Sequence, residues 1–273
     1  MEGAPGRPKK ISELAEEIGH ELGGGVRMSE AEKIAYLKEY GDSLRINTDF
    51  VSVDTYRTLF ATLDLHGKTL INVGAGSPIG RGYPRVSPVM EALDQNNEEV
   101  VCIPIDYVPS RTKGWDLLDT EEVHRKSAVT LEPVTADATA LPFPSGSIDG
   151  YISTNLINEP RAEGSEVAFV KTLFAEAYRV LAPGGFLIVS SFGYFWWKTE
   201  DGTILYNDAI DVEEIVTVEQ VTQYLRDAGF SSIEPIPLNE KEVEAAVQER
   251  RARKQGVYRD AGVVEACAFF VRK

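Results

Sequence analysis

TLINVGAGSPIG, residues 69–80, is the stretch of sequence that decides the fold of this chain. It begins as an apolar run of the kind that forms a strand buried on both faces, at the centre of a parallel sheet. The run ends in Gly74 and Gly76, which let the backbone turn tightly and approach a ligand with no side chain in the way. Most glycine-rich turns bind no ligand, so a function can be predicted only together with the residues that follow.

The next apolar run ends in Asp106. A carboxylate at the end of the second strand is well placed to accept hydrogen bonds from both hydroxyls of a ribose. Its alternative role is that of a loop acid that caps a turn. Tyr107 follows it, and its ring either stacks on an adenine or is an ordinary half-buried aromatic. The glycine turn and Asp106 together predict a site for a nucleoside-containing cofactor.

Two more strands and a helix are expected after Asp106. Residues 131–137 form a third strand that ends in Asp137, and a short apolar turn follows; residues 147–155 form a fourth strand. A helix then carries the sequence EAYRVL, residues 176–181, and the turn APGG leads into a strand over residues 186–191. This alternation predicts a parallel sheet with right-handed crossovers.

The order of these parts resembles the class I S-adenosylmethionine-dependent methyltransferases, especially the broad group that acts on small molecules. The resemblance covers roughly residues 67–192 and rests on four motifs. They are the glycine turn, the acid after strand two, the sequence DATALPF from Asp137, and RVLAPGG from Arg179. The resemblance implies an α/β, Rossmann-like fold: a seven-stranded, mostly parallel sheet with an antiparallel last strand and helices on both faces.

The resemblance also implies which residues bind the cofactor, S-adenosyl-L-methionine. The backbone at Gly74, Ala75 and Gly76 would pass close to its methionine and ribose portions, while Asp106 accepts from the ribose and Tyr107 lies beside the adenine. Asp137 would accept from the exocyclic amine of the adenine, with the Ala138 N–H facing a ring nitrogen; its alternative role is a turn cap. Asn155 would offer its backbone or side chain to the cofactor. Asp149, Glu176 and Arg179 match family positions that we interpret as structural.

Two residues depart from the family pattern. Asn72 stands where the family commonly has an acid that contacts the methionine amino group, and Pro78 stands where a third glycine is frequent. Asn72 can accept the same hydrogen bond but supplies no countercharge. These departures leave open whether cofactor binding is weakened.

The methyl acceptor is expected to lie beyond strands four and five. Asn158 and Glu159 follow strand four, and Tyr194 belongs to an aromatic segment, residues 192–197, after strand five. These three are candidate catalytic or substrate-contacting residues, against the alternatives of a loop that ends in proline and of packing under a cap. The sulfonium already activates the methyl group, so catalysis would come mainly from proximity and alignment. A general base is needed only if the nucleophile holds its proton.

Composition disfavours several other classes of function. The formal net charge is −15, which disfavours nucleic acid and anionic membranes as partners. The resemblance implies a small-molecule acceptor as the substrate. Cys102 and Cys267 are expected to be buried free thiols of a reducing compartment. No apolar run approaches the roughly 20 residues of a membrane span, so a cytoplasmic protein is expected. Histidine and cysteine spacing indicates no metal site.

The chain is expected to have two parts. Residues 1–66 would form an N-terminal tail and helical cap, with helices over 11–22, 29–40 and 53–63, and residues 67–273 the methyltransferase domain. Toward the C-terminus, Thr217 opens a capped helix that ends near Gly229. A strand over 231–236, a helix over 240–253 and a last strand over 264–271 complete the domain.

Two other functions remain open from the sequence. A non-catalytic binding or scaffold protein on the same fold is supported by Asn72 and Pro78. An NAD(P)-dependent oxidoreductase is suggested by the loose glycine pattern of residues 74–80 and by the Tyr194-x-x-x-Lys198 spacing. The latter pair, however, is expected directly after a strand and outside any helix.

Overall fold

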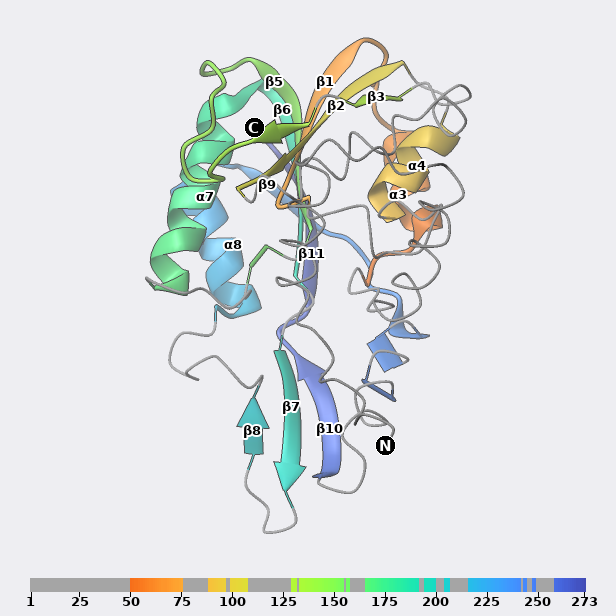
Figure 1. The fold of residues 1–273 in the computed structure, drawn as a ribbon, viewed down its shortest axis with the longest axis vertical. Coiled ribbons are helices and arrows are strands. Elements are labelled where there is room, and N and C mark those ends of the chain that lie inside the picture. The colour runs from red at the N-terminus through yellow and green to blue at the C-terminus, as the bar shows by residue number, and fades with distance from the viewer. Residues whose placement is uncertain are drawn as a thin grey trace, which may run out of the picture.

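The computed structural model of the chain describes thirteen stretches of residues. They are 50–75, 88–96, 99–107, 129–131, 133–154, 156–157, 165–191, 194–199, 204–206, 216–241, 243–244, 247–248 and 258–273. The main body is a large mixed sheet with helices on both faces, and a small antiparallel sheet extends from one end of it (Figure 1). The expected helices at 11–22 and 29–40 lie outside the described residues.

The main sheet has the predicted strand directions, mostly parallel with an antiparallel last strand. Its order is β3-β2-β1-β5-β6-β11-β9, and β4 also pairs with β2. β11 is antiparallel to both β6 and β9, whereas β1 to β6 pair in parallel. The expected third strand is split into β3 and β4, so the sheet counts eight strands in seven positions. The strands are β1 Lys68–Val73, β2 Val100–Asp106, β3 Val129–Leu131, β4 Val134–Thr135, β5 Ile148–Thr154, β6 Leu181–Ser191, β9 Ser232–Pro235 and β11 Cys267–Arg272.

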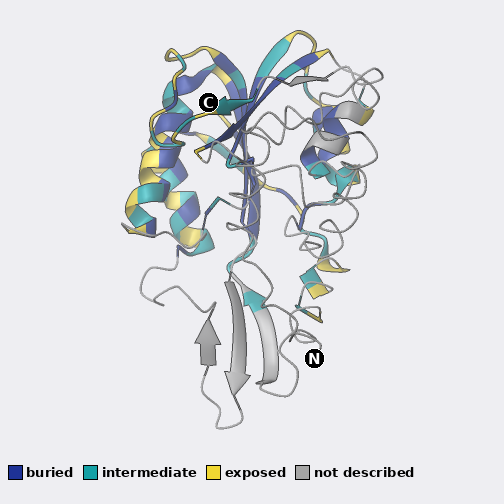
Figure 2. Cartoon of the chain, viewed as in Figure 1, coloured by how far each residue is buried: buried dark blue, intermediate teal, exposed yellow. Residues whose placement is uncertain are grey.

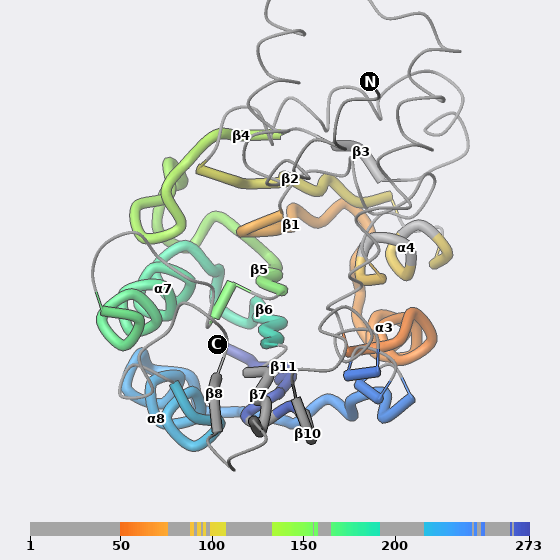
Figure 3. The backbone as a smooth tube through the Cα atoms, turned by 60° about the horizontal axis from the view of Figure 1, so that its bottom comes forward, coloured from red at the N-terminus to blue at the C-terminus, as the bar shows by residue number. Residues whose placement is uncertain are grey.

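Within the described stretches, four helices cover the two faces of this sheet. They are α3 Val53–Phe60, α4 Pro88–Gln95, α7 Glu166–Val180 and α8 Val218–Asp227. α7 and α8 lie on one face and α3 and α4 on the other (Figure 3). α8 begins with the predicted capping box between Thr217 and Gln220. The described residues of the expected 240–253 helix, which are 240–241, 243–244 and 247–248, are also helical.

Each face of the sheet has its own apolar core, because side chains alternate along a strand. The α7/α8 core contains Ile71 and Val73 of β1 together with Val170, Leu173 and Phe174 of α7. The α3/α4 core contains Leu70 of β1, with Tyr56, Phe60, Val89 and Leu93 from its two helices. The central strands are buried almost throughout, whereas the outer faces of α7 and α8 are exposed (Figure 2). Burial on both faces confirms the interpretation of the 69–73 run.

A three-stranded antiparallel sheet, which we call the arm, was not predicted. It consists of β7 Tyr194–Thr199, β8 Ile204–Tyr206 and β10 Tyr258–Val264, in the order β10-β7-β8. β7 and β10 continue β6 and β11 beyond a short break, and Ser191 pairs with Cys267 just as Tyr194 pairs with Val264. The register is therefore the same on both sides of the break. The arm is an extension of the β6–β11 pair beyond the carboxyl end of β6.

The aromatic segment belongs from Tyr194 onward to strand β7, Tyr194–Thr199, which was not predicted as a strand. Aromatic residues favour a pleated strand when a neighbouring strand is available, and β10 provides that neighbour from a distant part of the sequence. The last strand also begins later than expected. Glu265, with φ at 58°, separates Val264 of β10 from Cys267 of β11.

Candidate functional site

Four neighbouring strands of the main sheet carry buried polar residues on one face, near their carboxyl ends. Leu70, two residues before Asn72, packs in the α3/α4 core, so the Asn72 side chain belongs to the same face. The same spacing holds on the other three strands, which lie in the order β2-β1-β5-β6. We call these residues the polar row; each is between 2% and 5% exposed, and they are Asn72, Asp106, Thr154 and Ser190.

Strand register fixes the positions of these four residues relative to one another along the strand direction. Thr154 and Ser190 are direct partners across β5 and β6. Asn72 pairs with Pro104 and with Ile152, so it lies two residues deeper in the sheet than Asp106 and Thr154. A ligand that crosses the end of β1 therefore has Asp106 on one side and Thr154 on the other, with Asn72 beneath it.

Two polar atoms of the row have no hydrogen-bond partner in the described structure. They are Oδ1 of Asn72 and Oγ of Ser190, both buried. A buried polar atom without a partner is unfavourable by roughly 1–3 kcal/mol, and such atoms in a folded protein call for an explanation. A polar ligand at the carboxyl edge of the sheet would satisfy them.

Gly74 begins the turn after β1 with φ at +70°, in the left-handed region that favours glycine. A Cβ at this position would lie 2.9 Å from Cδ1 of Leu156, so the turn also packs tightly against the segment after β5. Ala75 donates its N–H to the carbonyl of Ile105 at 3.0 Å, which holds the start of the turn against the end of β2. Gly76 lies outside the described residues.

Asp106 lies where the sequence predicts it, as the last residue of β2. Its side chain is buried at 4% exposure, and its carbonyl accepts from the N–H of Ala136 at 3.1 Å. This contact brings the end of β2 beside the turn that carries Asp137. Tyr107 is 72% exposed, so its alternative role as a half-buried aromatic is wrong. Its ring is accessible to a flat ligand beside Asp106.

Asp137 caps its own turn. Its Oδ1 accepts from the N–H and from the Oγ1 of Thr139, both at 2.8 Å, and its carbonyl accepts from Ala140 N–H at 3.0 Å. The turn-cap alternative is thus present in the structure. Both side-chain bonds use one oxygen and the residue is exposed, so the cap leaves Oδ2 for a further donor. Ala138, next in the chain, is half-buried.

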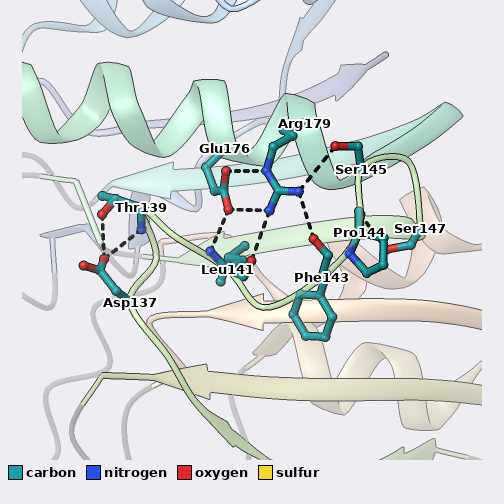
Figure 4. A network of polar contacts seen from close by, with 9 residues as sticks. All are labelled: Asp137, Thr139, Leu141, Phe143, Pro144, Ser145, Ser147, Glu176 and Arg179. Atoms are coloured by element: carbon teal, nitrogen blue, oxygen red, sulfur yellow. Dashed lines mark hydrogen bonds and ion pairs between the residues drawn. The ribbon is translucent and has the colours of Figure 1, made fainter.

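Glu176 and Arg179 of α7 hold the segment that follows this turn (Figure 4). Arg179 forms a two-pronged pair with the Glu176 carboxylate, with Nε to Oε2 and Nη2 to Oε1 both at 2.7 Å. Arg179 also donates to the carbonyls of Phe143 and Leu141, and Glu176 Oε1 accepts from the Leu141 N–H. The hydrogen bond from Arg179, above all, lowers the pKa of Glu176. These contacts agree with a structural role for both residues.

Of the remaining predicted site residues, only Tyr194 lies within the described part of the chain. Asn155, Asn158 and Glu159 lie outside the described residues, as Gly76 does. Tyr194 is the first residue of β7. Within the stretches that the structure describes, no group of three or more His, Cys, Asp or Glu residues is arranged to hold a metal ion.

Sequence reasoning did not identify Thr154 and Ser190 as site residues. Both lie in strands that were predicted, and a usable signal was present. Counting in steps of two from the apolar residues Ile152 and Ile188 places each hydroxyl on the face of Asn72 and Asp106. What was missing was the strand order and register that make the four residues neighbours.

A family model matches a segment that contains part of this geometry. Residues 85–189 match the model of a family described as "Methyltransferase domain". The matched segment contains Asp106, the Asp137 turn, and the Glu176–Arg179 pair with the strand that follows it. Over this segment the chain resembles methyltransferases, which supports the expected likeness to the class I S-adenosylmethionine-dependent methyltransferases.

The solved structures that match this chain do so at low sequence identity. An S-adenosylmethionine-dependent methyltransferase from Aquifex aeolicus has 15% identity and a TM-score of 0.49, covering 88% of this chain and 96% of that one. One from Mesorhizobium loti has 16% identity and a TM-score of 0.48, covering 79% and 96%. The [4+2]-cyclase SpnF has 19% identity and a TM-score of 0.48, covering 81% and 80%.

Comparison of the chain with curated proteins gives no match. Among the helices of the described segments, none combines the length and the apolar character needed to cross a membrane.

Proposed function

We propose that the protein transfers a methyl group from S-adenosyl-L-methionine to a small-molecule acceptor. The observation that carries the proposal is the polar row at the carboxyl edge, where Asn72 Oδ1 is buried and without a partner. The glycine turn follows Asn72 at the end of β1. Asp106, at the end of the neighbouring strand β2, and Asp137, in the turn after β4, lie to one side of Asn72. This arrangement suits a ligand with an amino group at one end and a nucleoside at the other.

The residues present fit this cofactor. Asp106 would accept from the two ribose hydroxyls and Asp137 Oδ2 from the adenine amine, with Tyr107 exposed beside them. Asn72 Oδ1 would accept from the amino group of the methionine portion, and Gly74 and Ala75 would form the turn over which that portion lies. When bound, the cofactor supplies an electrophilic methyl group on a sulfonium. The protein has to align the acceptor with it and exclude water.

The acceptor side is proposed to lie beyond β5 and β6. Asn155, Asn158 and Glu159 follow β5, and the aromatic strand β7 continues β6 away from the same edge. An aromatic strand there favours an organic acceptor of small size, and the net charge of −15 disfavours nucleic acid. We further propose that residues 1–66 form the cap over this acceptor site.

The structure weakens the oxidoreductase alternative. Tyr194 and Lys198 both lie in β7, so four residues of extended chain separate their backbones by roughly 13 Å. The helical spacing that would make them neighbours is about 6 Å. A non-catalytic binding protein remains the second hypothesis, since Asn72 leaves the amino group of the cofactor without a countercharge.

Calorimetric titration of the full chain tests the proposal. The ligands are S-adenosylmethionine and S-adenosylhomocysteine, with NADH and NADPH as controls. Asp106→Ala should weaken binding by about 100-fold, because two charge-assisted hydrogen bonds at roughly 1.5 kcal/mol each are lost. Asp227→Ala is the matched control, since that carboxylate is exposed on α8 and pairs only with Gln223 among the described residues.

Binding of both sulfur ligands, weakened by Asp106→Ala and not by Asp227→Ala, supports the cofactor site and justifies a screen of acceptors. Unchanged binding in a folded Asp106→Ala protein would contradict the site. Binding without turnover on any acceptor class would favour the non-catalytic hypothesis. Binding of a nicotinamide cofactor alone would favour the oxidoreductase.

A further inference from the structure

We propose that Glu176 and Arg179 are positioning residues for the adenine half of the cofactor. They would act by holding the turn of residues 137–145 in the geometry that presents Asp137 and Ala138. This inference rests on the function proposed above, and it assigns a binding role to two side chains of α7 that do not touch the cofactor.

The contacts concentrate on Leu141, four residues after Asp137. Its N–H donates to Glu176 Oε1 at 2.6 Å and its carbonyl accepts from Arg179 Nη2 at 3.1 Å. Arg179 Nη1 reaches the carbonyl of Phe143 at 2.8 Å. Three backbone groups of the turn are thus bound by one ion pair, as Figure 4 shows. The Leu141 side chain is buried in the α7/α8 core, which adds an apolar anchor at the same residue.

The turn needs this support because it has few backbone partners of its own. β4 before it is only two residues long, and no helix or further strand begins until β5 at Ile148. Asp137 and Thr139 close the first half by local hydrogen bonds. The second half depends on α7, since a segment outside helix and sheet must satisfy its backbone polar groups elsewhere.

The ion pair is itself fixed by its surroundings. Glu176 is buried, at 9% exposure, and the Arg179 fork matches its carboxylate in two parallel bonds. A lysine at 179 would keep the charge but lack the planar fork, so it cannot make these bonds and reach two carbonyls at once. Arg179→Lys therefore loosens the turn without leaving Glu176 as an isolated buried charge.

The experiment compares two ligands whose difference lies at the adenine. One is S-adenosylhomocysteine, and the other is its analogue with hypoxanthine in place of adenine, which lacks the exocyclic amine. The full-length protein should bind the adenine ligand about 10-fold or more tightly than the analogue, because the analogue leaves Asp137 without its donor. Arg179→Lys should weaken the adenine ligand by about 10-fold and the analogue by less than about twofold, so the preference collapses.

Arg57→Lys is the matched control. Arg57 pairs with Asp54 at the same i, i+3 spacing on α3, but both are exposed and the pair touches no turn. The Arg57→Lys variant should prefer the adenine ligand over the analogue as strongly as the unaltered protein does. Hydrogen exchange adds a readout without ligand: the Leu141 amide should lose protection in Arg179→Lys and keep it in Arg57→Lys.

Each result decides the inference. If Arg179→Lys weakens the binding of both ligands equally, the protein is loosened in general and the inference is overturned. The inference is also overturned if Arg179→Lys leaves the preference for adenine unchanged, or if the unaltered protein does not distinguish the two ligands. If Arg179→Lys does not fold, Glu176→Gln replaces it, because glutamine keeps an acceptor for the Leu141 N–H and loses the ion pair. Failure of the proposed function is a separate outcome, in which the parent protein binds neither ligand.

Discussion

At the scale of single residues, the candidate site has a neutral amide at Asn72, where the resembled family commonly has an acid. Asn72 and Ser190 are buried with unpartnered oxygens, a state that is unfavourable until a ligand supplies a donor. A carboxylate at position 72 would be worse in the free protein, because a buried charge without a partner is far more costly than a buried amide. The amide thus keeps an acceptor beneath the turn at a lower free-energy cost.

Gly74 gives the first prediction at this scale. Gly74→Ala should lower the free energy of unfolding by about 2–3 kcal/mol, because φ is +70° and the new Cβ would press on Leu156 at 2.9 Å. Gly67→Ala separates the two causes, since Gly67 has φ at +69° but nothing within 4 Å of a new Cβ. It should lose only about 1–2 kcal/mol.

Urea denaturation measures both variants. A double variant that adds Leu156→Ala should recover part of the Gly74→Ala loss, because the smaller side chain makes room for the new methyl group. Equal losses for Gly67→Ala and Gly74→Ala would mean that Leu156 moves aside freely and that only the backbone conformation requires glycine at position 74.

At the scale of elements, α7 has two tasks. Val170, Leu173 and Phe174 bury one side of it against the sheet, while Glu176 and Arg179 reach the turn after β4. The backbone carbonyls at its C-terminal end also accept hydrogen bonds from a residue that is distant in the sequence. Lys273 Nζ donates to the carbonyls of Tyr178 and Leu181, both at 2.6 Å, where the last carbonyls of a helix lack partners within it. One helix therefore connects the core, the candidate site and the last strand.

The Glu176–Arg179 pair predicts a pH dependence of stability. Hydrogen bonding from Arg179 lowers the pKa of Glu176 from its ordinary value of 4.5. A carboxyl whose pKa is lower in the folded state stabilises that state fully above the unfolded pKa, and this contribution is lost as the pH falls through the folded pKa. The unaltered protein should therefore exceed Glu176→Gln in stability at neutral pH, with a difference that shrinks below about pH 5.

Urea titrations of both proteins across this range measure the difference. Curves that stay parallel down to the acid limit of folding would contradict the assignment of the lowered pKa to this pair. Glu234→Gln serves as the control, because Glu234 is exposed on β9 and takes no part in the Glu176–Arg179 pair.

At the scale of the whole molecule, the two cores and the arm define how the site is built. The sheet separates an α3/α4 core from an α7/α8 core, and the polar row ends the α3/α4 face at the carboxyl edge. β6 and β11 then continue in unchanged register into the arm. Glu265 sits at this junction, and its Oε2 accepts from the N–H of Val218 at 2.6 Å, which binds the first turn of α8 to the junction.

The cysteines provide a test of this packing across the whole molecule. Burial raises the pKa of Cys102 and of Cys267 to about 12, one on each face of the sheet. Neither thiol should react with Ellman's reagent at about pH 8 in the folded protein, since the thiolate is the reactive form. Both should react at once in guanidinium chloride. Rapid reaction of one thiol in the folded protein would contradict this packing and would show that the core containing that cysteine opens to solvent.

Sequence alone determined the parts of this protein that depend on local pattern. The doubly buried 69–73 run, the acids that end β2 and follow β4, the capping box of α8 and the buried free thiols all follow from residue type and spacing. Such features are set within a few residues, by side-chain alternation, backbone conformation and capping, so the chain carries them without reference to distant partners. The resemblance to a known family, which rests on the order of these parts, added the antiparallel last strand.

Only the tertiary structure decided which of these parts meet. The polar row exists because β2, β1, β5 and β6 lie side by side in a fixed register, although Asn72 and Ser190 are far apart in the sequence. The arm exists because β10 pairs with the aromatic strand β7, a pairing between distant segments that was not predicted from the sequence. Leu141 is held by side chains of a helix that begins well after it. Strand pairing and side-chain contacts between distant segments are properties of the folded chain, since their free energy appears only when both partners are in place.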